Sequence, residues 1–213
     1  MGKYLINVAF NTRVNKTIRT LEIAESFGLG LDEKEWTLYD NLELDIARGD
    51  VVYVTGQSGS GKSVILRELQ GLMAKNGLTV ASIDDFVFQD DTNVIDQLGK
   101  TTSDALGLLS MAGLNDAYLF VRKPSEMSDG QKYRLKIAKL IESGADVWVA
   151  DEFGAVLDRV TAQVVASNLQ RAARAAGATV IVATTHEDLK NALRPSVQIT
   201  KHYKERVKVD YEH

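Results

Sequence analysis

A glycine-rich loop between an apolar strand and a helix constrains this chain more than any other feature. The run Val51–Val54 is followed by Gly56–Ser63 and then by a helix-forming segment. Glycines so placed let backbone N–H groups surround phosphate oxygens, and the helix N-terminus adds a favourable dipole. The pattern predicts a phosphate-binding loop in which Lys62 reaches the β and γ phosphates and Ser63 binds Mg²⁺. The alternative is a glycine-rich turn that merely begins a helix. The predicted nucleotide-binding residues are Gly56, Gln57, Ser58, Gly59, Ser60, Gly61, Lys62, Ser63 and Val64.

Short apolar runs alternate with helix-like segments along most of the chain. The predicted strands cover 51–54, 78–83, 147–150 and 179–183, and the predicted helices cover 62–74, 131–141, 161–175 and 188–193. Strands that alternate with helices favour an α/β fold with a mostly parallel sheet flanked by helices. Because 213 residues is the size of one domain, we interpret 1–213 as a single domain.

Two parts of the chain do not follow this alternation. Residues 92–123 have leucines at helical spacing interrupted by glycines, so we predict a small inserted helical subdomain over about 92–135. Near the amino end, Tyr4–Phe10 is typical of a strand and predicts a β-rich part. Ile18–Phe27 fits a helix by one set of apolar residues and a strand by another, which leaves 12–35 undecided. A closing strand and a polar tail are expected in 201–213.

Composition excludes several classes of protein. The chain has 25 Lys and Arg against 29 Asp and Glu, a net charge of −4, and no cysteine. Disulfides, thiolate metal sites and cysteine nucleophiles are therefore excluded. No apolar run approaches the roughly 18 residues of a membrane helix, so we expect a cytoplasmic protein without direct membrane insertion. The mildly acidic balance disfavours a surface that binds nucleic acid throughout.

The acidic end of one apolar strand is a second candidate for nucleotide chemistry. Val147–Ala150 is followed directly by Asp151 and Glu152. Parallel sheets present the carboxyl ends of their strands to ligands. Asp151 is therefore predicted to complete the Mg²⁺ coordination, and Glu152 to orient or deprotonate the attacking water. The alternative is an acidic strand end that caps the next helix.

The segment Met127–Gln131 precedes a predicted helix and has two interpretations. Ser128 with Gln131 three residues later is a capping box that could begin any helix. The segment also resembles the signature of the ATP-binding cassette (ABC) ATPases, usually Leu-Ser-Gly-Gly-Gln. Met127 and Asp129 depart from that pattern.

Further motifs occur in the order of the same family. Residues 151–158 resemble its acidic strand end and D-loop, although Phe153 stands where the family usually has Pro. His186 resembles the switch histidine, and Gln89 resembles the glutamine that senses Mg²⁺ and the γ-phosphate. A lone His or Gln is usually an ordinary polar residue. Together with the phosphate loop and the signature, these motifs make the chain resemble ABC ATPases from about residue 35 to residue 188.

The resemblance implies a P-loop NTPase of ABC type that binds ATP and Mg²⁺ and hydrolyses ATP between two chains. It assigns catalysis to Lys62, Glu152 and His186, and Mg²⁺ binding to Ser63, Gln89 and Asp151. One chain would contribute Ser128, Asp129, Gly130 and Gln131 to ATP held by the other chain. Asp158 of the D-loop would couple the two sites. A homodimer that forms on ATP binding is the expected assembly.

Adenine in this family usually stacks on an aromatic residue that precedes the phosphate loop. Phe27 and Trp36 are the candidates, and the sequence does not choose between them. Asp129 would oppose the γ-phosphate if it pointed inward, whereas in a first helical turn facing solvent it would favour the helix dipole.

The chain is shorter than transporter cassettes in two places. Only 27 positions separate Lys62 from Gln89, and 39 separate Gln89 from Ser128. The second interval is the helical region that transporter cassettes use to bind their membrane subunits. The trimmed layout resembles a group of soluble ABC-type ATPases, some fused to acetyltransferase-like domains, and no such domain is present in this sequence.

These observations favour a soluble ATPase that dimerises on ATP and acts on an unknown macromolecular client. The alternative is the nucleotide-binding subunit of an ABC transporter. A second alternative is an ATP-gated nucleic-acid-binding module, for which the sequence offers only the cluster Lys201, Lys204, Arg206 and Lys208. A nucleotide kinase is disfavoured by the signature, the D-loop and the histidine.

Overall fold

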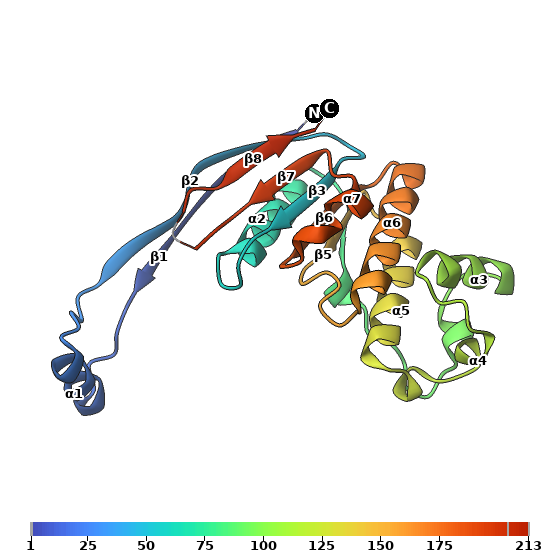
Figure 1. Ribbon diagram of the computed structural model, residues 1–213, viewed down its shortest axis with the longest axis horizontal. Coiled ribbons are helices and arrows are strands. Elements are labelled where there is room, and N and C mark those ends of the chain that lie inside the picture. Colours follow the sequence, from blue (N-terminus) through green and yellow to red (C-terminus); the bar gives the residue numbers. More distant parts are fainter. Residues whose placement is uncertain (1, 204, 213) are drawn as a thin grey trace. The chain divides into compact units, whose positions relative to one another are not determined.

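The computed structural model describes residues 2–203 and 205–212 (Figure 1). The chain packs into two compact units. One unit is residues 5–43, and the other is formed by the described residues before and after it. The larger unit contains a six-stranded sheet of order β4-β5-β6-β3-β7-β8, and β1 and β2 form a separate two-stranded sheet.

The six-stranded sheet is parallel except at one edge, where β8 pairs with β7 in the antiparallel sense. This confirms the predicted mostly parallel sheet. In the centre, Val54 of β3 lies opposite Ala183 of β6, and Ala150 of β5 lies opposite Val182 of β6. The strands are β3 (Val51–Thr55), β4 (Val80–Ser82), β5 (Val147–Ala150), β6 (Thr179–Thr184), β7 (Val197–Thr200) and β8 (Lys208–Tyr211).

Within the six-stranded sheet, the strand predictions differ from the structure at two strands. The strand expected over 78–83 is only three residues long, because Ser82 caps a 3₁₀ turn at Ile83–Asp85. Strand β7 was not predicted, since its four residues alternate between buried and half-buried instead of forming an apolar run. The expected closing strand is present as β8.

Helices cover the sheet on both faces, as predicted. On one face, Tyr53, Trp148 and Val182 belong to the same hydrophobic core as residues of α5 (Asp129–Glu142) and α6 (Arg159–Ala176). Helix α2 (Lys62–Lys75) contacts β4, β5 and β6. Figure 1 shows α5 and α6 beside one another. The helix expected over 188–193 is divided into a 3₁₀ turn, Glu187–Leu189, and a single turn, α7 (Lys190–Leu193).

The segment predicted to be helical carries α3 (Thr102–Met111) and α4 (Ala117–Phe120), with 3₁₀ turns at Val94–Gln97 and Pro124–Glu126. Its apolar side chains belong to the same core as the sheet, among them Val94, Leu109 and Leu114. The sheet and the signature helix α5 are therefore joined through one hydrophobic core.

The unit 5–43 is built from β1 (Gly2–Thr12), α1 (Ile18–Phe27) and β2 (Lys34–Ile46), whose strands extend past its ends. The strand predicted at the amino end is present. The segment left undecided is a helix because Thr17 and Thr20 form a capping box before it and Gly28 ends it with φ of 62°. Strand β2 was not predicted. Within this unit the rings of Phe10 and Trp36 lie 6.3 Å apart.

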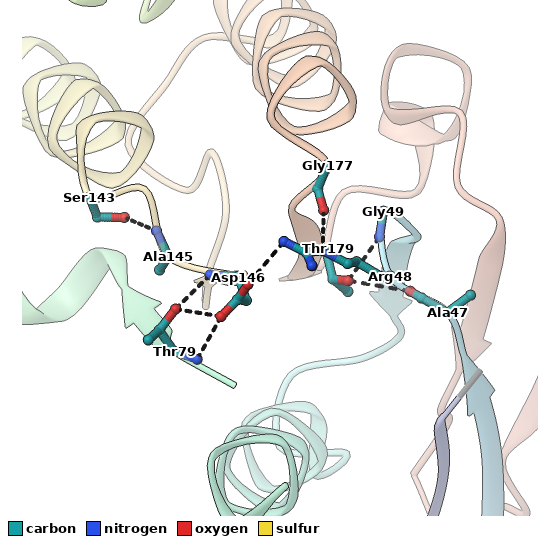
Figure 2. A network of polar contacts seen from close by, with 9 residues as sticks. All are labelled: Ala47, Arg48, Gly49, Thr79, Ser143, Ala145, Asp146, Gly177 and Thr179. Carbon is teal, nitrogen blue, oxygen red and sulfur yellow. Dashed lines mark hydrogen bonds and ion pairs between the residues drawn. The ribbon is translucent and has the colours of Figure 1, made fainter. Parts of the chain in front are cut away.

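The amino-terminal edge of the six-stranded sheet is closed by polar side chains (Figure 2). Asp146 accepts hydrogen bonds from the backbone N–H and the hydroxyl of Thr79, at 3.0 and 2.7 Å, and pairs with Arg48 at 3.1 Å. The Thr179 hydroxyl accepts from the Gly49 N–H at 3.1 Å and donates to the Ala47 carbonyl at 3.3 Å. These groups satisfy one another in the folded chain.

Candidate nucleotide site

A cavity of about 480 Å³ lies at the opposite, carboxyl-terminal edge of the same sheet. The loops that follow β3, β5 and β6 line it together. Ligands of open α/β sheets bind at this edge. The lining residues are Ser58, Gly59, Gly61, Lys62, Ser63, Asp151, Glu152, Ala155, Thr184 and Thr185. The structure thus brings the predicted phosphate loop and the two predicted carboxylates to one cavity.

The phosphate loop needs glycine at two positions for different reasons. At Gly56, φ is 138° and a Cβ would lie 1.9 Å from the Lys201 carbonyl oxygen, so any side chain would collide with backbone. At Gly61, φ is 105°, and this residue forms the N-cap of α2. Val64 lies in the first turn of α2, and Ser60 is buried in the loop.

Lys62 is bound to its own loop in this structure. Its Nζ donates to the carbonyl oxygens of Gly56 and Gln57, at 2.9 and 2.7 Å. Burial lowers the pKa of Lys62, while the charges of Asp151 and Glu152 oppose that shift. The ammonium is therefore held at the cavity by backbone oxygens, which phosphate oxygens of a ligand could replace.

The two carboxylates after β5 differ in their settings. Asp151 is half-buried, and its Oδ1 accepts a hydrogen bond from the Glu152 N–H at 2.9 Å. Glu152 is exposed and has φ of 47°, a left-handed conformation that is uncommon for residues other than glycine. Such conformations persist where surrounding contacts hold them and are concentrated at functional sites.

The predicted signature forms the N-terminus of α5. Ser128 and Gln131 make the capping box. The Gln131 N–H donates to the Ser128 hydroxyl at 3.3 Å, and the Ser128 N–H donates to the Gln131 side-chain oxygen at 2.9 Å. Asp129 is exposed in the first turn, where its charge favours the helix dipole. Gly130 is close to the loop after β5, since a Cβ would lie 3.3 Å from the Val156 carbonyl oxygen.

The remaining predicted residues, Gln89, Asp158 and His186, are not among the described residues that line the cavity. Asp158 caps α6, accepting from the N–H and hydroxyl of Thr161 at 2.9 and 2.5 Å, and these bonds lower its pKa. Gln89 is exposed in its loop, where its amide oxygen accepts from Thr92 at 2.9 Å. His186 directly follows Thr185, a cavity-lining residue. Among the described residues, the lining includes neither Gln89, His186 nor the signature.

The cavity offers oxygen donors of the kind that Mg²⁺ prefers. The Ser63 hydroxyl and the Asp151 carboxylate both line it. Across residues 2–203 and 205–212, no group of three or more His, Cys, Asp or Glu could hold a metal ion by itself. This donor set fits an ion that keeps most of its ligands from phosphates and water, as Mg²⁺ does with nucleotides.

Several residues of this region were not predicted. Buried Tyr53 of β3 donates from its hydroxyl to the His186 carbonyl. Tyr133 of α5 accepts from the Gly154 N–H at 3.2 Å, and its ring meets the buried Phe153 ring edge-on at 6.1 Å. Thr184 also belongs to this set. A hydroxyl at the end of the apolar run 179–183 was the available signal for Thr184, whereas nothing local marked Tyr53 or Tyr133.

No family model matches the chain, but curated proteins and solved structures are similar to it. It is 33% identical over 181 residues to the aliphatic sulfonates import ATP-binding protein SsuB 2 of Rhodococcus jostii, covering 76% of this chain and 72% of that protein. It is 28% identical over 221 residues to the methionine import ATP-binding protein MetN 2 of the same organism, covering 85% of this chain but only 62% of that protein. A dimeric, ADP-bound structure of the ATP-binding cassette MJ0796 matches 97% of this chain, and 98% of that one, with a TM-score of 0.68 and 18% identity.

The fold and the cavity define a P-loop ATPase of ABC type, and the sequence relatives agree. The chain belongs to the ABC ATPase superfamily. Its function is that of an ABC nucleotide-binding domain, homologous to the ATP-binding subunits of transporters. The expected likeness to acetyltransferase-fused ATPases stays a prediction, and so does the choice between Phe27 and Trp36 for adenine. Within the described residues, no helix is long and apolar enough to cross a bilayer.

Proposed function

We propose that this chain binds Mg-ATP at the cavity after β3, β5 and β6 and hydrolyses the bond between the β and γ phosphates. The observation that carries the proposal is the convergence of Lys62, Ser63, Asp151 and Glu152 on one cavity. Phosphoryl transfer depends on positioning and charge stabilisation, and these four residues supply a cation, two oxygen donors for a metal and a base.

Each residue has a distinct role in this mechanism. Backbone N–H groups of the loop and the Lys62 ammonium bind the phosphates. Ser63 and Asp151 would hold Mg²⁺, which neutralises charge on the β and γ phosphate oxygens. Glu152 orients the attacking water and accepts its proton, and His186 would contact the γ-phosphate from the neighbouring loop.

We further propose that two chains enclose the nucleotide. The signature residues do not line the cavity of their own chain, although Gly130 lies beside the D-loop. In the dimer, Ser128 and Gly130 of one chain would bind the γ-phosphate held by the other. Ser128 could donate its hydroxyl proton to the phosphate while its oxygen still accepts from the Gln131 N–H. Asp129 faces solvent, which leaves room for an anion beside Gly130.

The client is proposed to be a membrane-embedded transport subunit. The sequence alone favoured a soluble ATPase with an unknown macromolecular client, but the relatives are import ATP-binding proteins, which supports the transporter alternative. The loop before the helical segment and the segment itself present apolar surface, with Val87 exposed by 91% in the loop and Tyr118 and Val121 by 77 and 67% in the segment. A second cavity of about 570 Å³ beside Leu106, Phe120 and Val121 could receive a helix of that subunit.

Nucleic acid has less support as a client. Lys201, part of the basic cluster, is 3% exposed, and its Nζ donates to the carbonyls of His202 and Glu205. Lys208 pairs with Asp210 at 2.9 Å. Lys204 lies outside the described residues. The cluster is thus partly buried or paired, and strongly salt-dependent DNA binding would be needed to restore it as a nucleic-acid site.

The test of ATP hydrolysis is phosphate release with Mg-ATP. Lys62→Ala should abolish ATP binding, and Glu152→Gln should keep binding but lose turnover. Lys75→Ala and Glu68→Gln, on the same helix α2, are matched controls expected to behave as the natural chain. Full activity in Lys62→Ala or Glu152→Gln would contradict the assigned roles.

The test of the client is co-purification with a membrane protein. Tyr118→Glu should abolish co-purification and leave the ATPase rate of the isolated chain unchanged. Val164→Glu, an exposed apolar position on α6, is the control. Purification of the chain with a soluble protein instead, unaffected by Tyr118→Glu, would favour the soluble client.

A further inference from the structure

The loop that carries Glu152 is bonded to the end of β6 by two hydrogen bonds, and a third bond joins the end of β6 to His186. The Phe153 N–H donates to the Ala183 carbonyl at 2.8 Å. The Thr184 hydroxyl donates to the Phe153 carbonyl at 2.9 Å. The hydroxyl oxygen of Thr184 also accepts from the His186 N–H at 3.1 Å. One hydroxyl therefore links the residue after Glu152 to the backbone of His186.

Phe153 is held on every side. Both of its backbone groups are bonded to β6, its side chain is fully buried, and its ring contacts Tyr133. Proline at this position could not donate to Ala183, because it has no N–H. Glu152 has a left-handed φ of 47°, a conformation that persists only where neighbouring contacts hold it. The bonds of Phe153, the next residue, supply such contacts.

His186 is held in a similar way from the other direction. Its N–H donates to Thr184, and its carbonyl accepts from the hydroxyl of the buried Tyr53. An ion pair at the surface adds a second link. Arg159, at the start of α6, pairs at 2.6 Å with Asp188, in the turn after His186. The two turns are joined both in the interior and at the surface.

The geometry points to Thr184 as a positioning residue, whose hydroxyl fixes Glu152 and His186 relative to each other for ATP hydrolysis. This inference rests on the proposed function. Thr184 lines the cavity but is only 2% exposed, and its hydroxyl proton is already donated to the Phe153 carbonyl, so we infer that it acts through its neighbours. Only a hydroxyl can donate and accept at once in so small a space, which restricts the position to Thr or Ser.

The experiment compares Thr184→Val, which keeps the shape, with Thr184→Ser, which keeps the hydroxyl. Losing the link should lower kcat by roughly 10- to 100-fold, as small misplacements of catalytic groups do. Mg-ATP affinity, measured by equilibrium binding, should stay within about twofold because the phosphate loop is untouched. Thr184→Ser should restore kcat. Thr184→Ala repeats the test if Thr184→Val does not fold.

Thr179→Val is the matched control. Thr179 lies at the other end of β6, is 4% exposed, and its hydroxyl also donates one hydrogen bond and accepts another. This variant should lose stability while its kcat stays unchanged. A fall in kcat of equal size in Thr179→Val and Thr184→Val would show that Thr184 is merely structural and would overturn the inference.

A double-mutant cycle separates positioning from an independent effect. If Thr184 acts through Glu152, Thr184→Val should add little further loss in single-turnover hydrolysis once Glu152→Gln is present. Fully multiplicative losses would contradict the inference. Failure of the proposed function is distinguishable, because then the natural chain itself would release no phosphate. A natural chain that hydrolyses ATP alongside an equally active, folded Thr184→Val would contradict the inference alone.

Discussion

Thr179 and Thr184 stand at opposite ends of the same strand, and the hydroxyl of each one both donates and accepts a hydrogen bond. Around Thr179, at the amino-terminal edge of the sheet, polar groups such as Asp146 and Arg48 bind one another (Figure 2). Around Thr184, at the carboxyl-terminal edge, Asp151 and Glu152 line a cavity. At one edge the polar groups bond one another within the fold, and at the other the two carboxylates line a cavity.

The two edges of this sheet serve different purposes, one for stability and the other for activity. Buried polar groups that satisfy each other contribute to folding, and removing one of them leaves its partner unsatisfied. Polar groups that line a cavity are arranged for a ligand, at some cost in local strain, as the left-handed Glu152 illustrates. Substitutions at the amino-terminal edge should therefore lower stability and leave kcat unchanged, whereas those at the carboxyl-terminal edge should lower kcat and leave stability unchanged.

The largest expected effect is at the carboxyl-terminal edge. Glu152→Gln should lower kcat by about 10²- to 10⁴-fold, because it removes the proposed base for the attacking water. Its thermal unfolding midpoint should not fall, since the side chain is exposed and φ of 47° is equally available to Gln. Phosphate release and a thermal melt on the same preparation check both. A large loss of stability would remove the contrast between the edges.

At the amino-terminal edge, Thr179→Val should destabilise the chain by about 1–3 kcal/mol, because it leaves the Gly49 N–H without its acceptor. Urea unfolding measures this, and kcat at a temperature well below the transition should match the natural chain. Lost turnover with unchanged stability would reverse the contrast that the two edges present.

Asp146 should make the stability of this edge sensitive to acid. The hydrogen bonds from Thr79 and the charge of Arg48 hold the pKa of Asp146 below its ordinary value. The carboxylate therefore contributes stability above the unfolded pKa of about 3.9, and that contribution disappears as the pH falls through the lower folded pKa. Asp146→Asn should be less stable than the natural chain at pH 7, with a gap that narrows in acid. Urea midpoints measured along a pH series test this, and a constant gap would contradict it.

The smallest effect should come from Arg48→Ala. The guanidinium is 72% exposed, so its ion pair with Asp146 is worth only about 0.2–1 kcal/mol and is weakened by salt. Urea unfolding at low and high salt should show a small difference that shrinks as salt is added. An effect as large as that of Thr179→Val would mean that the exposed ion pair, and not the buried hydroxyl, holds this edge.

The sequence allowed much of the fold to be predicted where the pattern is local. The central strands β3, β5 and β6 are continuous apolar runs, and the phosphate loop is a contiguous motif next to one of them. Strand β7 was missed because it has no apolar run. For Ile18–Phe27 the apolar spacing was ambiguous, and the Thr17 capping box and Gly28 decide that it is a helix.

The site was predictable to the same extent. The residues that line the cavity follow directly after strands that could be recognised, so Lys62, Ser63, Asp151 and Glu152 were found. The groups that hold the loop around Glu152 were not found. Tyr53 contacts His186, Tyr133 contacts Gly154, and Thr184 contacts Phe153 only because separate elements pack together. Contacts between distant parts of a chain leave no local pattern.

The most direct test of the account is the molar mass of the Glu152→Gln chain by light scattering, with and without Mg-ATP. A nucleotide site shared between two chains predicts a monomer of 23.4 kDa without nucleotide and twice that mass with Mg-ATP, because the proposed Glu152→Gln defect would keep ATP from being hydrolysed. A mass that stays monomeric while bound ATP is detected would contradict the shared site.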